Sequence, residues 1–371
     1  MLGPDGPSWG RLYESPVWKP RAPPRGSVMK ESLTFDDVLL IPQYSTVKSR
    51  KDVDVSVQLG PFKFAHPLIP ANMASVMEEE MAATAINNGG LAILHRFASL
   101  EYQSRLFLKL SQGLNIHTNH NDQLGFSLGV NQESYHAFDY LYADTGCKIW
   151  CLDIAHADHE LAIKMIRFLK SKEKKSDCKF LIIAGNVVTG AAAKRLWDNG
   201  ADVVKCGIGS GSICSSRIVA GHGRGQLSAL MDVHDTRRIY HPNKFIISDG
   251  GCRTSGDLVK ALCFSEMVMA GNLFAGCHEA PGHTTMINSI PYKEYNGSST
   301  YKKSHIEGVR GFVPVSDSYE NVLTKLLEGV KSGCSYSGVG KVKDLQINPI
   351  LEKITGQGLT ESKPHDIVLD T

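Results

Sequence analysis

Short apolar runs alternate along this chain with longer stretches of helical spacing, and each run ends near a Gly, Asn, Asp or His. The runs are apolar at both alternating positions, which is typical of parallel strands buried on both faces rather than of strands with one wet face. Eight such runs occur, at residues 66–73, 90–97, 124–130, 148–156, 180–187, 201–209, 244–251 and 266–273.

Eight strand–helix units predict an α/β fold, the TIM (β/α)8 barrel, whose active site lies at the carboxyl ends of the strands. A doubly wound sheet is the alternative, but no GxGxxG motif opens an early helix. A long polar segment, residues 278–318, follows the eighth run. We expect it to form an active-site flap, since long loops in compact barrels usually serve as lids. A disordered surface insertion is the other interpretation of this segment.

The two ends of the chain fall outside this pattern. Residues 1–28 are dense in Pro and Gly, which favours a disordered N-terminal appendage. The barrel, flap included, is expected to occupy residues 29–345, and residues 346–371 a C-terminal tail.

Composition narrows the class of partner. The net charge is +2, from 40 basic and 38 acidic residues, which gives no general reason to bind nucleic acid or an anionic membrane. No apolar stretch approaches the roughly 18 residues of a membrane-spanning helix. The nine cysteines form no metal-type CxxC pair, and no secretory segment precedes them. We therefore expect a cytoplasmic protein with reduced thiols and a small-molecule substrate.

Polar residues gather where the barrel interpretation places the active site. Because the barrel interior below is filled with aliphatic side chains, the strand-end groups should face one shared pocket. These groups are Asn72, His95, Arg96, Asp153, His156, Asn186, Cys214, Ser248 and Asp249.

Cys214 is the candidate nucleophile. A reactive thiolate must be accessible to the substrate and is stabilised by a nearby positive charge. Cys214 lies on a Gly-rich strand-end loop three residues before Arg217. The alternative is a small apolar filler, like Cys206 within its apolar run. Gly-rich segments also follow the seventh and eighth runs, at 248–252 and 270–272, where barrels build phosphate sites. A phosphorylated substrate is therefore expected.

Five motifs, LTFDDVLLIPQYS, NVVTG, GIGSGSICSSR, SDGGCRTSGD and AGNLFAG, together resemble the IMP dehydrogenase/GMP reductase family over roughly residues 30–345. The resemblance implies a TIM barrel, a purine nucleotide monophosphate substrate, a nicotinamide cofactor and a cysteine that bonds to purine C2. It also implies a homo-oligomer, a tetramer in this family, with the VKSR segment reaching a neighbouring subunit's cofactor.

The resemblance carries roles onto individual positions. The catalytic residues would be Cys214, Ser216 and Glu307. The cofactor would lie against Ser49, Arg50, Arg96, Asp153, Ile154, Ala155, Ile208 and Gly209. The substrate would be held by Ser212, Asp249, Gly250, Gly251, Gly271, Asn272, Gly297, Ser298 and Gly308. A monovalent cation, expected to be K⁺, would be held at Gly209, Gly211, Cys214 and Arg217.

Some positions depart from the family pattern. The chain reads GSGS where the family usually has Gly-Pro-Gly-Ser, and CSS where it has Cys-Thr-Thr. Ser216 thus keeps a hydroxyl but lacks the methyl that restricts χ1. Ala74 and Gly297 replace an Asp and a Met of many members. These changes bear on rate and affinity more than on the type of reaction.

The flap separates the two branches of the family. Dehydrogenases use an Arg-Tyr pair on a long flap to activate water, and this chain has none in YNGSSTYKKSHIEGVRG. Glu307 falls where reductases keep a proton-transferring glutamate. The prediction is a GMP reductase that uses NADPH, with IMP dehydrogenase using NAD as the alternative. A non-catalytic nucleotide-binding protein is a third possibility, supported only by the GSGS and CSS departures.

Overall fold

The structure is a computed structural model that describes residues 29–112, 122–297 and 309–367. The chain divides into two compact units, Met1–Glu31 and Ser32–Thr371. In the first unit only residues 29–31 are described, without helix or strand. The boundaries expected at residues 28 and 345 stay predictions.

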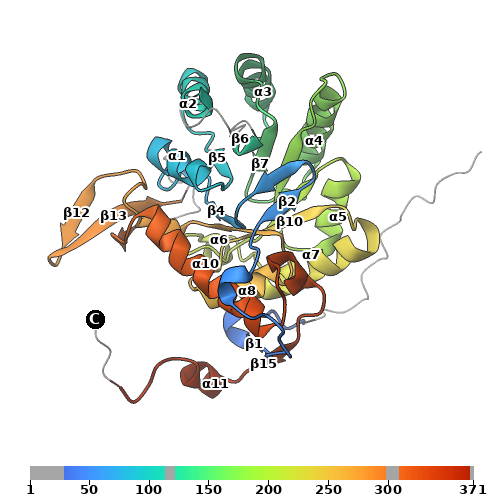
Figure 1. Cartoon of the computed structure of the whole chain (residues 1–371). Helices are drawn as coiled ribbons and strands as arrows, with labels where there is room; N and C mark the ends of the chain where they lie inside the picture. The colour runs from blue at the N-terminus through green and yellow to red at the C-terminus, as the bar shows by residue number, and fades with distance from the viewer. Residues whose placement is uncertain (1–28, 113–121, 298–308, 368–371) are drawn as a thin grey trace, which may run out of the picture. The chain divides into compact units, whose positions relative to one another are not determined.

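The second unit is built on a sheet of eight parallel strands in the order β4-β11-β10-β9-β8-β7-β6-β5 (Figure 1). The sheet curls into a nearly closed barrel, which confirms the predicted TIM fold. Every predicted run contains one of the strands. They are β4 (Leu68–Pro70), β5 (Ala92–Leu94), β6 (Leu124–Leu128), β7 (Ile149–Asp153), β8 (Leu181–Val187), β9 (Val203–Cys206), β10 (Phe245–Asp249) and β11 (Met267–Ala270).

Helices follow the strands and cover the barrel. Several begin at a residue whose side chain accepts the amide three positions on, as Thr189 does from Ala192 (3.2 Å) and Thr254 from Asp257 (3.2 Å). The helices are α1 (Glu79–Asn87), α2 (Leu100–Gln112), α3 (Gln132–Thr145), α4 (Glu160–Glu173), α5 (Gly190–Asp198), α6 (Ser216–Val219), α7 (Gln226–Tyr240), α8 (Ser255–Leu262), α9 (Asn272–Ala275), α10 (Tyr319–Tyr336) and α11 (Gly356–Glu361).

Antiparallel pieces complete the unit. β1 (Val38–Leu40) pairs with β15 (Leu351–Lys353), and β2 (Val57–Leu59) forms a hairpin with β3 (Phe62–Phe64). The segment expected to form the flap contains a three-stranded sheet of β12 (Thr284–Ile287), β13 (Ile290–Asn296) and β14 (Arg310–Pro314). The segment expected as a tail supplies β15, so it is attached to the first strand after the N-terminal region. Short 3₁₀ turns are η1 (Phe35–Asp37), η2 (Arg50–Asp52) and η5 (Val342–Gln346).

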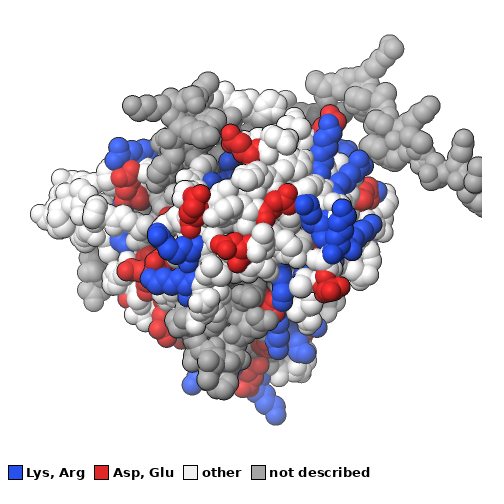
Figure 2. Space-filling model, turned by 90° about the horizontal axis from the view of Figure 1, so that it is seen from above, with Lys and Arg blue, Asp and Glu red and all other residues white. Residues whose placement is uncertain are grey.

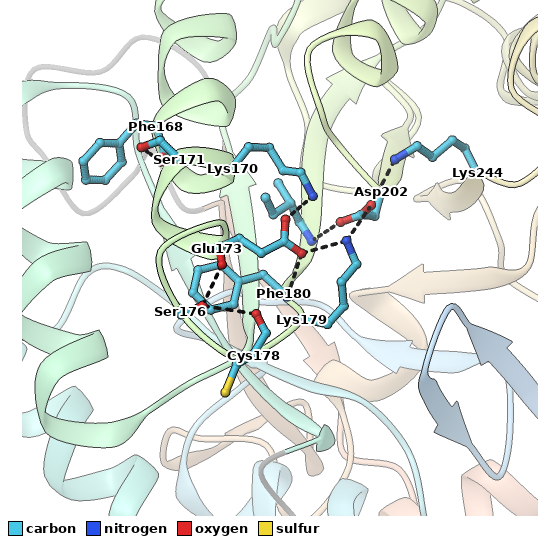
Figure 3. Close-up of polar contacts among 11 residues, drawn as sticks. Phe168, Lys170, Ser171, Glu173, Ser176, Cys178, Lys179, Phe180, Asp202 and Lys244 are labelled. Atoms are coloured by element: carbon cyan, nitrogen blue, oxygen red, sulfur yellow. Dashed lines mark hydrogen bonds and ion pairs between the residues drawn. The ribbon is translucent and has the colours of Figure 1, made fainter.

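A charged network holds the amino ends of β8, β9 and β10 together (Figure 3). Glu173 accepts hydrogen bonds from Lys179 Nζ (2.7 Å) and the Phe180 amide (3.1 Å), and Asp202 accepts from Lys244 Nζ (2.9 Å). Burial would raise the pKa of Glu173, but its lysine partners and the Phe180 amide hold that pKa below its ordinary value. This end of a TIM barrel serves stability, so the functional groups are sought at the other end.

The surface matches the balanced composition. Figure 2 shows Lys and Arg side chains interspersed with Asp and Glu over one face of the molecule. Within the described ranges, no helix is both long and apolar enough to cross a bilayer.

Two of the three buried histidines in the described ranges lie away from the barrel mouth: His66 before β4 and His234 in α7, at 2% and 3% exposure. The Leu68 amide donates to His66 Nδ1 (3.3 Å), while His66 Nε2 has no partner among the described atoms. Burial lowers the pKa of His66 to about 4, and burial together with the Arg237 charge lowers that of His234 to about 4. Both rings are therefore neutral in the folded protein at neutral pH.

We expect stability to fall on mild acidification because of these rings. A histidine of ordinary pKa, 6.5, binds a proton in the unfolded chain before it does so in the fold. The contribution of His66 is thus complete above pH 6.5 and is lost as the pH falls toward 4, by about 2–3 kcal/mol. Urea unfolding at pH 7.5 and pH 4.5 should show a smaller pH-dependent loss in His66→Asn than in the wild type. Equal losses in the two proteins would contradict this assignment.

Candidate active site

A buried lysine joins two carboxylates at the carboxyl end of the barrel. Lys205, on β9, is only 2% exposed, and its Nζ lies 2.8 Å from Asp153 Oδ1 and 2.8 Å from Asp249 Oδ2. Asp153 is the last residue of β7, and Asp249 is the last residue of β10. Three strands thus meet through one ammonium group, directly below the loops that follow them.

Two asparagines complete this network from other strands. Asn186, on β8, donates from Nδ2 to Asp249 Oδ2 (2.8 Å) and to the Gly207 carbonyl (2.6 Å). Asn72, just after β4, donates from Nδ2 to Ser127 Oγ on β6 (2.8 Å). Side chains from most of the barrel strands therefore converge on this layer.

The network decides the protonation state of its members. Burial would raise the pKa of Asp153, but the Lys205 charge and hydrogen bond, with help from Arg96 and Asn72, hold that pKa below its ordinary value. Burial would likewise lower the pKa of Lys205, and Asp153 and Asp249 raise it well above its ordinary value instead. The site therefore presents an ionised carboxylate beside a permanently charged lysine.

The Cys214 loop is placed directly on this network. Gly207, which follows β9, has φ +151°, and a Cβ there would lie 2.0 Å from the Asp249 carbonyl oxygen, so only glycine fits. Ser210 Oγ donates to the same carbonyl (3.3 Å). Further along, the Cys214 amide donates to the Gly211 carbonyl (3.1 Å), and the Cys214 thiol donates to Ser216 Oγ (3.4 Å).

Exposure singles out Cys214 among the nine cysteines. Seven are buried, and burial raises the pKa of their thiols, for example to about 12 for Cys151 and Cys263. Only Cys178 and Cys214 are exposed, and Cys178 lies before β8, at the amino end of the strands. Cys214 is therefore the accessible thiol at the carboxyl end of the barrel.

The loops expected to hold phosphate also lie at this end. The Gly250 amide donates to the Met269 carbonyl (3.2 Å), which ties the loop after β10 to β11. Gly271 follows β11, and a Cβ there would lie 2.1 Å from Tyr295 Oη. Tyr295 belongs to β13 and is 4% exposed, so the flap sheet packs closely against this glycine.

The base of the flap contacts the cysteine loop. The Val309 amide donates to the Ile213 carbonyl (3.2 Å), and the Gly297 amide donates to the Val309 carbonyl (3.3 Å). Asn296 is held in turn by Ser75, whose Oγ donates to its carbonyl (3.1 Å). Gly297 is thus anchored beside the Cys214 loop, whereas Ser298, Glu307 and Gly308 lie outside the described residues.

The residues expected on the cofactor side divide into two groups. Arg96 is exposed after β5, with its guanidinium 4.8 Å from the centre of the Phe97 ring, and its charge acts on Asp153. Ile154 and Ala155 follow Asp153 directly; Ile154 is partly exposed and Ala155 is exposed.

Ser49 and Arg50 lie at η2, which packs against α10, with Arg50 5.9 Å from the Tyr336 ring centre. The structure does not bring these two residues to the strand-end network.

The remaining predicted residues follow β9, β10 and β11 at the carboxyl end of the barrel. Ser212 and Asn272 are exposed, whereas Ile208, Gly209, Gly211 and Gly251 are partly exposed. A Cβ on Gly209 would lie 2.5 Å from Arg217 Cγ, so this arginine packs on the glycine, and its guanidinium donates to the Arg224 carbonyl.

Lys205 is the functional residue that sequence reasoning missed. It lies within the apolar run 201–209, and a lysine inside a strand buried on both faces needs a partner of opposite charge. This need for a partner, together with the acidic residues at the ends of other apolar runs, is the feature of the sequence that could have identified Lys205.

Comparison with known proteins agrees with the fold. Residues 32–365 match the family described as "IMP dehydrogenase / GMP reductase domain", and the chain belongs to this family.

Similar proteins carry both activities in their names. An inosine-5'-monophosphate dehydrogenase from Borreliella burgdorferi is 33% identical over 92% of this chain and 98% of its own length. A GMP reductase from Acidovorax sp. is 36% identical over 85% of this chain and 94% of its own length. A GMP reductase variant from Trypanosoma brucei, solved with guanosine 5'-monophosphate, has a TM-score of 0.84 at 26% identity, covering 92% of this chain and 99% of that one. The chain is thus similar to oxidoreductases of purine nucleotide metabolism.

The Lys205 network makes a prediction about stability. Lys205→Met leaves the mostly buried Asp153 carboxylate without its cation, which should destabilise the fold by about 3–5 kcal/mol at pH 8. In that variant the pKa of Asp153 should rise above its ordinary value, so acidification neutralises the group and the loss should be smaller at pH 5. Chemical unfolding at both pH values measures the difference.

Matched variants isolate the buried charge. Lys194 forms a surface ion pair with Asp198, so Lys194→Met should cost well under about 1 kcal/mol. Adding Asp153→Asn to Lys205→Met should recover part of the stability at pH 8. A loss that is the same at both pH values, or no larger than that of Lys194→Met, would refute the role given to Lys205.

Proposed function

We propose that this protein is a GMP reductase, which converts GMP to IMP and ammonia with NADPH as the hydride donor. The observation that carries the proposal is the short flap. The Gly297 amide donates to the Val309 carbonyl (3.3 Å), so the two described ends of the flap meet, with only residues 298–308 between them in the sequence. Their sequence, SSTYKKSHIEG, contains no Arg-Tyr pair to activate water, but it contains Glu307.

The proposed chemistry begins at Cys214. Its sulfur forms a bond to purine C2, and the bond from C2 to the exocyclic amine then breaks as ammonia leaves. Glu307 and the Ser216 hydroxyl move the proton that the departing amine requires. A hydride then reaches C2, and the bond between sulfur and C2 breaks to release IMP and the Cys214 thiolate. The contact between the Cys214 thiol and Ser216 Oγ supports this pairing of nucleophile and proton carrier.

The substrate is positioned by the network and the glycine loops. Asp249, fixed by Lys205 and Asn186, is available to accept from the ribose hydroxyls. Ser212, Gly250, Gly251, Gly271 and Asn272 would hold the 5'-phosphate, and Gly297, Ser298 and Gly308 would border the base. The close approach of Gly271 to Tyr295 supports a tightly formed phosphate loop there.

The dinucleotide supplies the hydride when it is bound, and the residues present suit it. Exposed Arg96 offers a guanidinium for a phosphate group, and Asp153 with Ile154 and Ala155 presents one edge of the barrel mouth. Ile208 and Gly209 lie on the loop that follows β9 and are partly exposed. Ser49 and Arg50 lie apart from this group, so they would contribute only to the cofactor of another subunit. A homotetramer therefore forms part of the proposal.

The loop after β9 also suits a monovalent cation. Such ions take backbone carbonyl oxygens, and the Gly209, Gly211 and Cys214 carbonyls belong to one glycine-rich turn. The Gly211 carbonyl already accepts the Cys214 amide and keeps a second lone pair. Arg217 packs on Gly209 and shapes this turn. These residues would hold K⁺ and keep the Cys214 loop in its folded form.

A second candidate, IMP dehydrogenase, is favoured by one observation. The Borreliella burgdorferi dehydrogenase is similar over nearly the whole chain, at 33% identity. It would use the same Cys214 adduct but would deliver the hydride to NAD and hydrolyse the adduct to XMP.

Absorbance at 340 nm distinguishes the two activities. With GMP and NADPH, we expect NADPH oxidation that depends on GMP and releases ammonia in equal amount. With IMP and NAD, we expect no comparable rate of NAD reduction. Robust NAD reduction with IMP, without NADPH oxidation with GMP, would overturn the proposal in favour of the dehydrogenase.

Cys214→Ala should abolish turnover, by about 10⁴-fold or more, because no other accessible thiol lies at this end of the barrel. Calorimetric titration should show that the variant still binds GMP, since the phosphate and ribose groups are untouched. Cys178→Ala, which removes the other exposed thiol, should keep full activity. Substantial turnover by Cys214→Ala would remove the covalent step from the proposed mechanism.

A further inference from the structure

A second polar cluster lies beside the barrel mouth and joins His95, one of the predicted strand-end groups, to two residues to which the site gives no role. Glu78 is the residue before α1, but its carboxylate caps none of the helix amides. It reaches instead to His95, just after β5, and to Tyr102 in α2. Its Oε1 lies 2.7 Å from His95 Nε2, and its Oε2 accepts from the Tyr102 hydroxyl (2.8 Å).

The contacts fix the orientation of the histidine ring. The Phe97 amide donates to His95 Nδ1 (3.2 Å), so Nδ1 is the acceptor and Nε2 carries the proton that is donated to Glu78. The ring is 6% exposed and stacks on Phe97 at 6.1 Å between centroids. His95 therefore has one tautomer and one position.

The charges within the cluster are also defined. Burial would raise the pKa of Glu78, but the hydrogen bonds from His95 and Tyr102 hold it below its ordinary value. Burial and the Glu78 hydrogen bond raise the pKa of Tyr102 to about 12. The ionised Glu78 carboxylate thus engages both partners, with one oxygen at His95 Nε2 and the other at the Tyr102 hydroxyl.

In the sequence, Arg96 lies between His95, which Glu78 contacts, and Phe97, which stacks on His95. Its neighbours in the chain, His95 and Phe97, are joined by the ring stack and by the backbone hydrogen bond, while Arg96 itself is exposed. Its guanidinium rests 4.8 Å from the Phe97 ring centre, and its charge acts on Asp153. The guanidinium is thus held over the barrel mouth before any ligand arrives.

We propose that Glu78 and Tyr102, acting through His95, are positioning residues that pre-organise Arg96 to receive a phosphate group of the dinucleotide. This inference rests on the proposed function, in which Arg96 binds that phosphate. A pre-organised guanidinium binds without the entropy loss of ordering a long side chain, so the cluster acts on dinucleotide affinity and leaves the chemical step alone.

The test is a cycle of variants in the full-length enzyme. Glu78→Gln keeps the shape of the side chain and removes the charge that fixes His95. It should raise the KM for NADPH about tenfold, with kcat and the KM for GMP unchanged, and Tyr102→Phe should have a smaller effect in the same direction. In an Arg96→Ala background, Glu78→Gln should have no further effect on the NADPH KM.

Glu79→Gln is the matched control. Glu79 adjoins Glu78 but forms an exposed ion pair with Lys109, so its removal should leave every kinetic constant unchanged. A change in kcat or in the GMP KM with Glu78→Gln would show a general structural role and overturn the inference. So would an increase in the NADPH KM that persists in full in the Arg96→Ala background, or an unchanged NADPH KM.

The outcomes separate this inference from the proposed function. If Arg96→Ala leaves the dinucleotide KM unchanged, the role of Arg96 in the proposed function has failed, and the inference fails with it. If the active pair is IMP and NAD, the reductase proposal has failed, and the same cycle measured on the NAD KM still decides whether Glu78 acts through Arg96.

Discussion

The architecture of the site depends on burying one positive charge. Lys205 is 2% exposed on a barrel strand, and such a charge is tolerated only if it is paired. Asp153 and Asp249 supply the pairs, each at 2.8 Å, from β7, which lies one strand beyond β8, and from the adjacent β10. The carboxyl ends of these strands are thereby fixed relative to one another. The carboxylates proposed to face the cofactor and the substrate share one cation, so the two subsites have a fixed spacing.

The ion pairs of Lys205 also determine how the loop after β9 and the base of the flap are placed. Gly207 must be glycine because the Asp249 backbone passes within 2.0 Å of its would-be Cβ, and Asn186 joins Asp249 to the Gly207 carbonyl. The chain beyond Gly207 turns to present Cys214. The flap base then bonds to the same loop through Ile213. An apolar barrel thus supports a polar layer, which in turn supports the reactive loop.

The sequence predicted the barrel because a periodic local pattern repeats in all eight units, and it predicted that Asp153, Cys214 and Asp249 lie at strand ends for the same reason. Contacts between residues that are far apart in the sequence are not marked by any periodic local pattern. The pairing of β1 with β15 joins segments about 300 residues apart, and nothing in LEK at 351–353 signals a partner. Lys205 and the contact between Glu78 and His95 were missed because each depends on which strands become neighbours. The positions of Ser49 and Arg50 depend in the same way on how η2 packs against α10.

The central claim is that Lys205 keeps Asp153 ionised within the barrel. Carbon-13 NMR of aspartate-labelled protein, with the Asp153 carboxyl signal assigned by its loss in Asp153→Asn, measures this directly. The account predicts that this signal does not titrate between pH 8 and pH 4.5 in the wild type and does titrate within that range in Lys205→Met. A wild-type midpoint within that range, or the same behaviour in both proteins, would contradict it.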